Sequence, residues 1–210
     1  MELLAALGIS AILAGLTTPP PPSPAEALAR RIEEKHRKAV DFTAAFVQTY
    51  RSGMLGREVT ERGTVSVKPP GRMLWEYRDP EKKTFVCDGK TFFFYVPADR
   101  QVIVRDQGGD RGILARLLSG QGDMLSQFDA GLETAPSGRT RLRLTPRKPD
   151  PDVDRIFIEP DGGDRIQFLE ILDAQGNRSQ FRFEGIRVNV GLPDRLFHFE
   201  VPSGVEVIAG

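Results

Sequence analysis

The side chains that most often carry out chemistry are scarce and scattered in this 210-residue sequence. The two histidines, His36 and His198, have neither metal-ligand spacing nor a nucleophile nearby that either could activate. The single cysteine, Cys87, excludes an intramolecular disulfide and a Cys-based zinc site. Because it ends an apolar segment, we expect Cys87 to be a small buried core residue.

One acidic pattern is similar to the start of a calcium-binding loop. Asp150, Asp152 and Asp154 alternate, but Arg155 stands where such a loop needs Gly, and Asp161 stands where it needs Glu. We therefore interpret the segment as a solvated acidic turn. The sequence also contains no nucleophile elbow, phosphate loop or zincin motif, so we predict a protein that is not an enzyme and that uses no metal or cofactor.

The overall charge also limits the choice of partner. Lys plus Arg and Asp plus Glu each total 29, which gives a formal net charge of zero. A protein that binds nucleic acid usually presents a basic surface. We therefore predict no nucleic-acid partner.

The most informative stretch, residues 71–105, contains much of the aromatic surface. Segments 72–78, 84–87, 91–96 and 101–105 are rich in aromatic and β-branched residues and are bounded by Pro, Gly or Asp, which is typical of consecutive antiparallel strands. Asp88-Gly89 is a favoured hairpin turn between two of them. In the first strand Met73, Trp75 and Tyr77 share one face.

The rest of the chain adds more strands and two helices. Residues 25–40 predict a helix with a narrow apolar stripe that includes Leu28 and Ile32, and residues 111–119 predict a second helix whose apolar face holds Ile113, Leu114, Leu117 and Leu118. Further strands are expected at 42–50, 58–67, 128–133, 140–145, 154–159, 165–173, 178–189 and 197–201, with a tail at 205–208. The pattern indicates a mainly β (α+β) fold, one curved antiparallel sheet or open barrel.

Two features favour a ligand cavity over a fully packed core, which is the alternative. Residues 92–96 are apolar on both faces, so both sides of that strand need cover. Two short helices are also too few to fill a wide curling sheet. We therefore expect an apolar space whose wall includes Phe46, Met73, Trp75 and Tyr77.

The N-terminal segment predicts export. Residues 3–16 are almost wholly apolar, too short to span a bilayer but typical of the core of a secretory signal. Ala25-Glu26-Ala27 offers a small-x-small cleavage step, so we expect a signal and Pro-rich segment at 1–27 and a single domain at 28–210. An uncleaved membrane anchor with a Pro-rich tether is the alternative.

The sequence resembles the periplasmic outer-membrane lipoprotein carriers, the LolA family, along most of its length. The matching segments are DFTAAFVQ (41–48), Gly63, KPPGRMLWEY (68–77), Pro80, DGKT (88–91), YVP (95–97), QV (101–102), LTP (144–146), DAQGN (173–177), Asn189 and LFHFEVPSGV (196–205). The resemblance implies an incompletely closed antiparallel half-barrel, with helices forming a lid over an apolar cavity that holds the acyl chains of lipoproteins. It also implies a periplasmic chaperone, which we expect to be a monomer, that takes acylated lipoproteins from an inner-membrane ATP-driven extractor to an outer-membrane receptor.

We expect ten residues to form the apolar cavity and its lid. They are Leu28, Ile32, Phe46, Met73, Trp75, Tyr77, Ile113, Leu114, Leu117 and Leu118.

One position departs from the family pattern. Many members carry a basic residue where this chain has Pro69, and in the best-known type that residue holds the lid shut. Arg72 is close by, but its strand parity opposes that of Trp75, so we expect it to point away from the cavity.

Two other classes of function are open from the sequence. A lipid-sensing regulatory module could use the same half-barrel without transporting anything. A hydrolase acting on lipid or glycan would need a nucleophile–base pair or a carboxylate pair in the cavity, and no such pair can be named.

Overall fold

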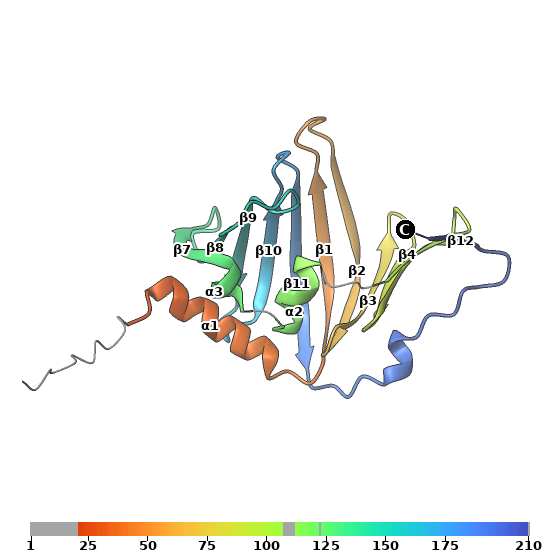
Figure 1. The fold of residues 1–210 in the computed structure, drawn as a ribbon, viewed down its shortest axis with the longest axis horizontal. Coiled ribbons are helices and arrows are strands. Elements are labelled where there is room, and N and C mark those ends of the chain that lie inside the picture. The colour runs from red at the N-terminus through yellow and green to blue at the C-terminus, as the bar shows by residue number, and fades with distance from the viewer. Residues whose placement is uncertain (1–20, 107–111, 122, 210) are drawn as a thin grey trace, which may run out of the picture.

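One long curved sheet dominates the structure, a computed structural model that describes residues 21–106, 112–121 and 123–209 (Figure 1). In the described residues the sheet runs in the order β12-β6-β5-β4-β3-β2-β1-β11-β10-β9-β8-β7. The strands are β1 (Phe42–Arg51), β2 (Glu58–Lys68), β3 (Arg72–Asp79), β4 (Lys83–Asp88), β5 (Thr91–Val96), β6 (Gln101–Asp106), β7 (Phe128–Thr134), β8 (Thr140–Pro146), β9 (Arg155–Pro160), β10 (Ile166–Leu172), β11 (Arg178–Val188) and β12 (Glu206–Ala209). Every pairing is antiparallel except that of β12 with β6. The edge strands β12 and β7 are not paired with each other, which confirms the predicted mainly β, incompletely closed half-barrel.

In the described part of the chain three α-helices form, and they cover the concave face of the sheet (Figure 1). They are α1 (Pro24–Arg37), α2 (Ile113–Ser119) and α3 (Met124–Gln127). Helix α1 begins with a capping box, in which the Ser23 side chain accepts from the Glu26 amide and the Glu26 carboxylate accepts from the Ser23 amide. Its buried stripe, which includes Leu28 and Ile32, packs into the main core, where α1 also contacts α2, α3, β7 and β8.

Helix α2 is short because its sequence supplies a strong stop signal. Gly120 follows its last residue with a φ of 62°, the left-handed conformation that glycine adopts without steric cost. A Cβ at this position would also lie 2.4 Å from the backbone nitrogen of Arg37. The end of α2 is therefore packed directly against the end of α1.

The C-terminal segment crosses to the outer, convex face of the sheet. The 3-10 helix η1 (Asp194–Phe197) contacts β3 and β4 there, and Phe197 joins a second small core with Leu74 and Val86. The buried Asp41 carboxylate holds the start of this segment, because it accepts from the amides of Val190 and Leu192, each at 2.7 Å. The outer face of β3 and β4 is thus covered by the chain's own C-terminal segment.

Several sequence-based boundaries were wrong. A strand at 197–201 does not form; its alternating Phe197 and Phe199 pack against the outer face of the sheet without pairing to it. The first helix ends at Arg37 rather than at residue 40, because Lys38 is its C-cap and β1 begins at Phe42. Helix α3 and η1 were not predicted, since four residues are too few to show a period.

Part of the predicted N-terminal region lies outside the described residues, including residues 3–16 and the first two prolines of the proline run; residues 107–111 also lie outside them. Ala27 does lie within α1, so cleavage after it would remove the capping box of this helix. None of the helices among the described residues has the length and hydropathy of a membrane span.

Candidate functional site

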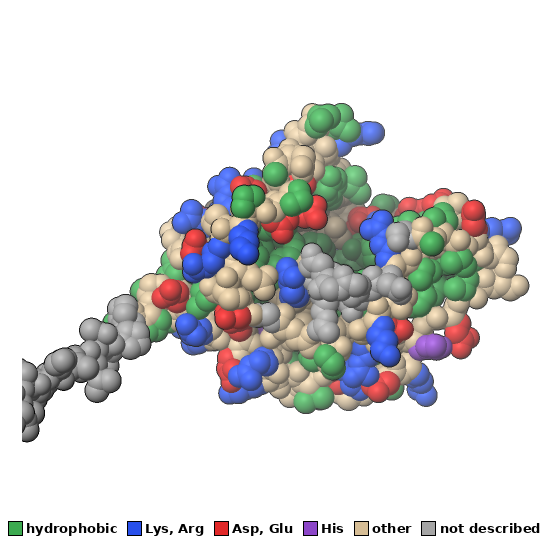
Figure 2. Space-filling view, in the orientation of Figure 1, with side chains coloured by type: hydrophobic (Ala, Val, Ile, Leu, Met, Phe, Trp, Pro, Cys, Tyr) green, Lys and Arg blue, Asp and Glu red, His purple; other side chains and the backbone are tan. Residues whose placement is uncertain are grey.

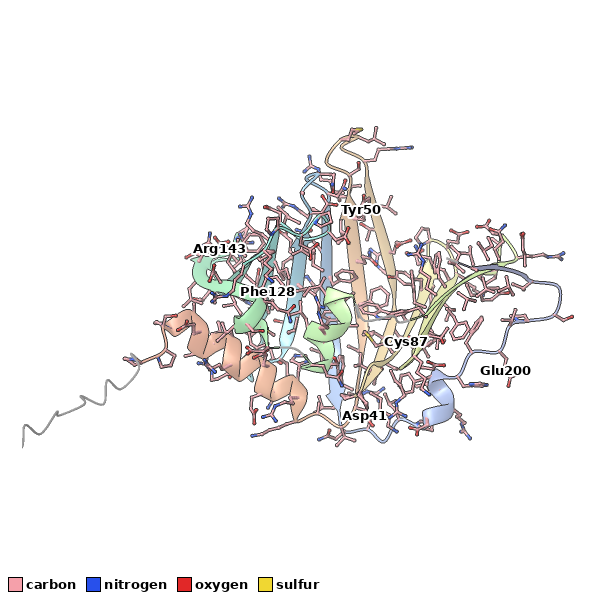
Figure 3. The ribbon with its side chains drawn as sticks, viewed as in Figure 1. Asp41, Tyr50, Cys87, Phe128, Arg143 and Glu200 are labelled. Carbon is pink, nitrogen blue, oxygen red and sulfur yellow. The ribbon has the colours of Figure 1, made fainter. Side chains whose placement is uncertain are left out.

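An apolar cavity of about 190 Å³ lies between the N-terminal half of α2 and strands β3, β4 and β5. Its lining residues are Met73, Trp75, Tyr77, Phe85, Val86, Cys87, Phe92, Gly112, Leu114 and Ala115. Figure 2 shows apolar atoms in the hollow between the projecting β1–β2 hairpin and the arm of the sheet that carries β4. The labelled Cys87 in Figure 3 lies at this side of the sheet.

Strand register explains why these side chains meet. Met73 pairs with Cys87, and Cys87 pairs with Phe92 on the next strand, so one row of the sheet supplies three lining residues. Trp75 pairs with Phe85 in the following row. Because paired residues point to the same face, the apolar positions of β3, β4 and β5 form one continuous wall.

The deep wall of the cavity is a set of aromatic rings in contact. Phe46 of β1 makes edge contacts with Trp75 and with Tyr77, each with ring centroids 4.9 Å apart. Phe85 stacks on Phe94 at 4.2 Å, nearer the edge of the sheet. Such contacts fix ring positions beyond what burial alone would do. The wall is therefore preformed.

Polar groups line one end of this wall. The Tyr77 hydroxyl donates to Oε1 of Gln48 at 2.6 Å, and the Lys83 ammonium lies 4.7 Å above the Tyr77 ring while it pairs with Glu61 at 2.5 Å. Burial, and then the Glu61 carboxylate, raise the pKa of the Tyr77 phenol well above its ordinary value of 10. Tyr77 is therefore neutral at physiological pH, and the site is a dry surface with one polar border.

A buried histidine ties the C-terminal end of α2 to both α1 and the sheet. His36 Nδ1 lies 3.0 Å from the Leu118 carbonyl, and Nε2 accepts from the Ile166 amide at 3.1 Å. These contacts require a neutral ring with its proton on Nδ1. Burial lowers the pKa of His36, which favours that form. Sequence reasoning assigned no such role to His36.

The structure brings together only some of the ten predicted site residues. Met73, Trp75, Tyr77 and Leu114 line the cavity directly, and Phe46 lies behind Trp75 and Tyr77. The other five lie elsewhere in or beside the main core: Leu28 and Ile32 on α1, and Ile113, Leu117 and Leu118 on α2. Leu28 and Ile32 pack over the other half of the sheet, because α1 contacts β7 and β8.

Sequence reasoning missed the contribution of β4 and β5 to the site. Phe85, Cys87 and Phe92 line the cavity together with Ala115 at the start of α2. Alternation along residues 84–87 could have placed Phe85 and Cys87 on one face. Their opposition to Trp75 and Met73, however, depends on a register that only the structure shows.

Arg72 points away from the cavity, as predicted. Its guanidinium pairs with Asp194 of η1 at 2.7 Å and approaches the Pro69 carbonyl at 3.4 Å. Lys68 binds the same carboxylate at 2.6 Å and the Leu192 carbonyl at 2.7 Å. The two hydrogen-bonding cations, Lys68 first, lower the pKa of Asp194. The basic residues around Pro69 thus hold the C-terminal segment and not the α2 lid.

A larger surface groove of about 870 Å³ runs along α1 but has different chemistry. Its lining is charged apart from Gly120, with residues such as Arg30, Lys35 and Asp123. Such a groove cannot exclude water from an acyl chain. The acidic segment around Asp150 forms a turn in which the Asp150 carboxylate accepts from the Asp152 amide, as predicted.

The fold and the cavity define a class of protein, an open β half-barrel that shields apolar groups under a short helix. The sequence model of the family described as "Outer membrane lipoprotein carrier protein LolA" matches residues 37–200. The chain belongs to this family.

Relatives at the level of the whole chain agree with this assignment. An "Outer-membrane lipoprotein carrier protein" from Hahella chejuensis is 32% identical over 176 residues, 80% of this chain and 81% of the relative. One with the same description from Chromohalobacter salexigens is 30% identical over 207 residues, 97% of this chain and 95% of the relative. An uncharacterized conserved protein from Thermus thermophilus shares the fold, with a TM-score of 0.55, 15% identity, and coverage of 90% of this chain and 100% of that chain.

Proposed function

We propose that this protein is a periplasmic chaperone that binds the acyl chains of lipoproteins in the cavity under α2 and carries them from the inner to the outer membrane. The observation that carries the proposal is the dry cavity of Met73, Trp75, Phe85 and Phe92 with a polar border at Tyr77. An amphiphile needs both environments at one site. The descriptions of the Hahella and Chromohalobacter relatives support lipoproteins as the cargo.

The size of the cavity indicates that α2 moves when cargo enters. A water molecule occupies about 30 Å³ of liquid, so 190 Å³ equals the volume of roughly six waters. That is too small for an acyl chain of roughly 15 methylenes. Because the C-terminal end of α2 is held by His36 while Leu114 and Ala115 near its N-terminal end face the cavity, we infer that the N-terminal end swings outward.

Energetics also favour a lid that opens and closes. A buried methylene contributes about 0.8 kcal/mol, so one chain of roughly 15 methylenes gains about 12 kcal/mol. Several fully buried chains would exceed the practical limit of about 20 kcal/mol for reversible binding. Displacing Ile113 and Leu114, which pack against the main core at the N-terminal end of α2, offsets part of this gain, so cargo can be released.

The proposal extends to export and to two membrane partners. We infer that the segment before α1 directs export, and that an inner-membrane ATP-driven extractor supplies cargo that an outer-membrane receptor accepts. N-terminal sequencing of the exported protein locates the cleavage. A first residue at Leu28 would match the small-x-small step, and one at or before Ser23 would preserve the capping box of α1.

The cavity can be tested with Trp75, the only tryptophan in the chain. An acylated peptide with bromine atoms on the acyl chain should quench Trp75 fluorescence, because bound bromine would lie against the indole ring. Leu114→Asp should weaken this quenching at least about tenfold, since it places a charge in the dry space.

A matched control separates binding from folding. Leu125 on α3 is also a half-buried leucine packed against the main core, but it does not line the cavity. Leu125→Asp should therefore leave quenching within about twofold of the parent. Absence of quenching in the parent at saturating peptide would refute the proposed site.

A further inference from the structure

The β1–β2 hairpin ends in an exposed apolar tip that the proposed function does not use. Met54 and Leu55 at its apex are 91% and 68% exposed. Tyr50 and Val59, a register pair just below the apex, are also exposed. Figures 1 and 2 show this hairpin projecting beyond the rest of the sheet, with apolar atoms at its end.

The tip is braced in this position. Ser52 and Arg57 close the loop through a backbone hydrogen bond of 2.9 Å, and the Gly53 amide donates to Oδ1 of Asn177 at 3.0 Å. Gly53 packs so closely on the β10–β11 turn that a Cβ there would lie 2.6 Å from the Gln175 carbonyl oxygen. The apex is therefore held away from the body of the protein and cannot bury its side chains against it.

Positive charge flanks the apex on both sides. Arg51 and Arg57 are exposed, and neither has an ion-pair partner among residues 21–106, 112–121 and 123–209. Glu58 stands opposite Arg51 in register and lowers the local charge only in part. An apolar apex flanked by cations is complementary to a bilayer surface, where phosphate groups overlie an apolar layer.

The tip is also aligned with the cavity. Phe46, Gln48 and Tyr50 alternate along β1 and therefore share one face, and Phe46 contacts the cavity wall at Trp75. The register pairs Gln48↔Glu61 and Tyr50↔Val59 continue this face from the polar border of the cavity to the hairpin end. A membrane bound by the tip would thus lie at the end of the sheet surface that leads into the cavity.

We propose that the β1–β2 hairpin tip, Met54 and Leu55 between Arg51 and Arg57, inserts into the headgroup layer of a membrane that contains anionic lipid. A protein partner is a poorer fit for an apex with only two apolar side chains at its end, because stable interfaces bury about 1,200 Å² or more. The contact is a property of the chain without cargo and does not depend on acyl binding.

Flotation of the exported, cargo-free protein with phospholipid vesicles tests the proposal. The parent should float with vesicles of mixed zwitterionic and anionic lipid, and more weakly with purely zwitterionic vesicles. Replacing both apex residues, Met54→Glu with Leu55→Glu, should reduce binding to both vesicle types at least about tenfold. Arg51→Ser with Arg57→Ser should remove the preference for anionic vesicles.

A second exposed apolar pair supplies the matched control. Val207 and Ile208 of β12 are adjacent, 56% and 36% exposed, and lie on a different part of the sheet. Val207→Glu with Ile208→Glu should float like the parent. The proposal would be overturned by a parent that does not float, by apex variants that float like the parent, or by equal losses in the β12 control.

The outcome can be separated from that of the proposed carrier function. Apex variants should keep the quenching of Trp75 by brominated acyl peptide, because no apex residue lines the cavity. A parent that floats but shows no quenching would support the tip and refute the cavity. If the parent did not float and the apex variants nevertheless impaired cargo transfer, the tip would bind a protein partner. That result would overturn the membrane contact.

Discussion

The two halves of the sheet differ in how completely their apolar concave face is covered. In the packed half, β7 to β11, α1 contacts β7, β8 and, through His36, β10, and α3 contacts β7. Leu142, Ile158 and Leu169 are completely buried there. In the cavity half, β3 to β5, α2 is the helix among the described residues that lies over the concave face, and Phe85 and Phe92 stay half-buried beside an open space. One curved sheet therefore contains both a core and a binding surface.

The difference comes from how much helix covers each half. Helix α1 has 14 residues and presents a continuous stripe to the sheet, whereas α2 has seven and ends at Gly120. The cavity half compensates on its outer face, where η1 and the C-terminal segment cover Leu74 and Val86. The concave face of β3 to β5 can then remain incompletely covered without exposing both sides of the sheet.

The largest expected effect is a difference in the free energy of unfolding between two variants, one from each half of the sheet. Ile158→Ala should lower the free energy of unfolding by about 4 kcal/mol, because it leaves a void in a close-packed region. Phe92→Ala should cost only about 1 kcal/mol, since its ring is half-buried and full burial is worth about 1.5–3 kcal/mol. Denaturant unfolding monitored by circular dichroism measures both values.

Acyl binding should reverse the order of these two variants. Phe92→Ala removes part of the cavity wall and should weaken quenching of Trp75 by brominated acyl peptide, whereas Ile158→Ala should leave it nearly unchanged below the unfolding transition. Equal losses of stability in the two variants would show that the halves do not differ as described.

A smaller, pH-dependent effect is expected where the packed half holds the lid. Burial lowers the pKa of His36 below its ordinary value of 6.5, so above that pH the ring is neutral in both folded and unfolded chains and its contribution is complete. As pH falls below 6.5, the unfolded chain binds the proton first, and stability declines until the lowered folded-state pKa is passed. Protonation also removes the acceptor for the Ile166 amide, worth about 1 kcal/mol.

The control for this effect is a side chain that does not titrate. His36→Gln retains a donor and an acceptor but does not titrate. Its free energy of unfolding should be lower than that of the parent near pH 7.5, and it should change less between pH 7 and 5. Stability curves of parent and variant with the same slope over this range would contradict a role for His36.

Much of the fold could be predicted because local signals and burial agreed. The strand at 91–96 was predicted with its observed bounds, and the parity of Met73, Trp75 and Tyr77 placed all three on the cavity face. Gly120 was correctly predicted to end the second helix. In each case the types of residues close together in the sequence determine the local structure.

The remainder depends on long-range contacts. Which half of the sheet each helix covers cannot be inferred from an apolar stripe: Leu28 and Ile32 were expected in the lid over the cavity, and they pack over the other half. The alternating Phe197 and Phe199 have a strand pattern but serve a second core. The role of His36 requires Leu118 and Ile166, which are 82 and 130 residues away in sequence.

The smallest effect is expected on the outer face, behind the cavity half. Arg72→Ala removes one of the two cations that bind Asp194, whose side chain is 70% exposed, and Lys68 keeps the other contact. Ion pairs in such solvated positions contribute about 0–1 kcal/mol, so unfolding should change by less than about 1 kcal/mol. Acyl binding and cargo transfer from inner-membrane vesicles should remain nearly intact, because the guanidinium lies on the face opposite Trp75.

Leu114→Asp, on the cavity face, is the contrasting variant in the same assays. If Arg72→Ala blocked loading or release as severely as Leu114→Asp, apolar contacts and the hydrogen bonds of His36 would not be sufficient to hold the lid. Arg72 would then act as a displaced latch, and the outer face would have to be counted as part of the site.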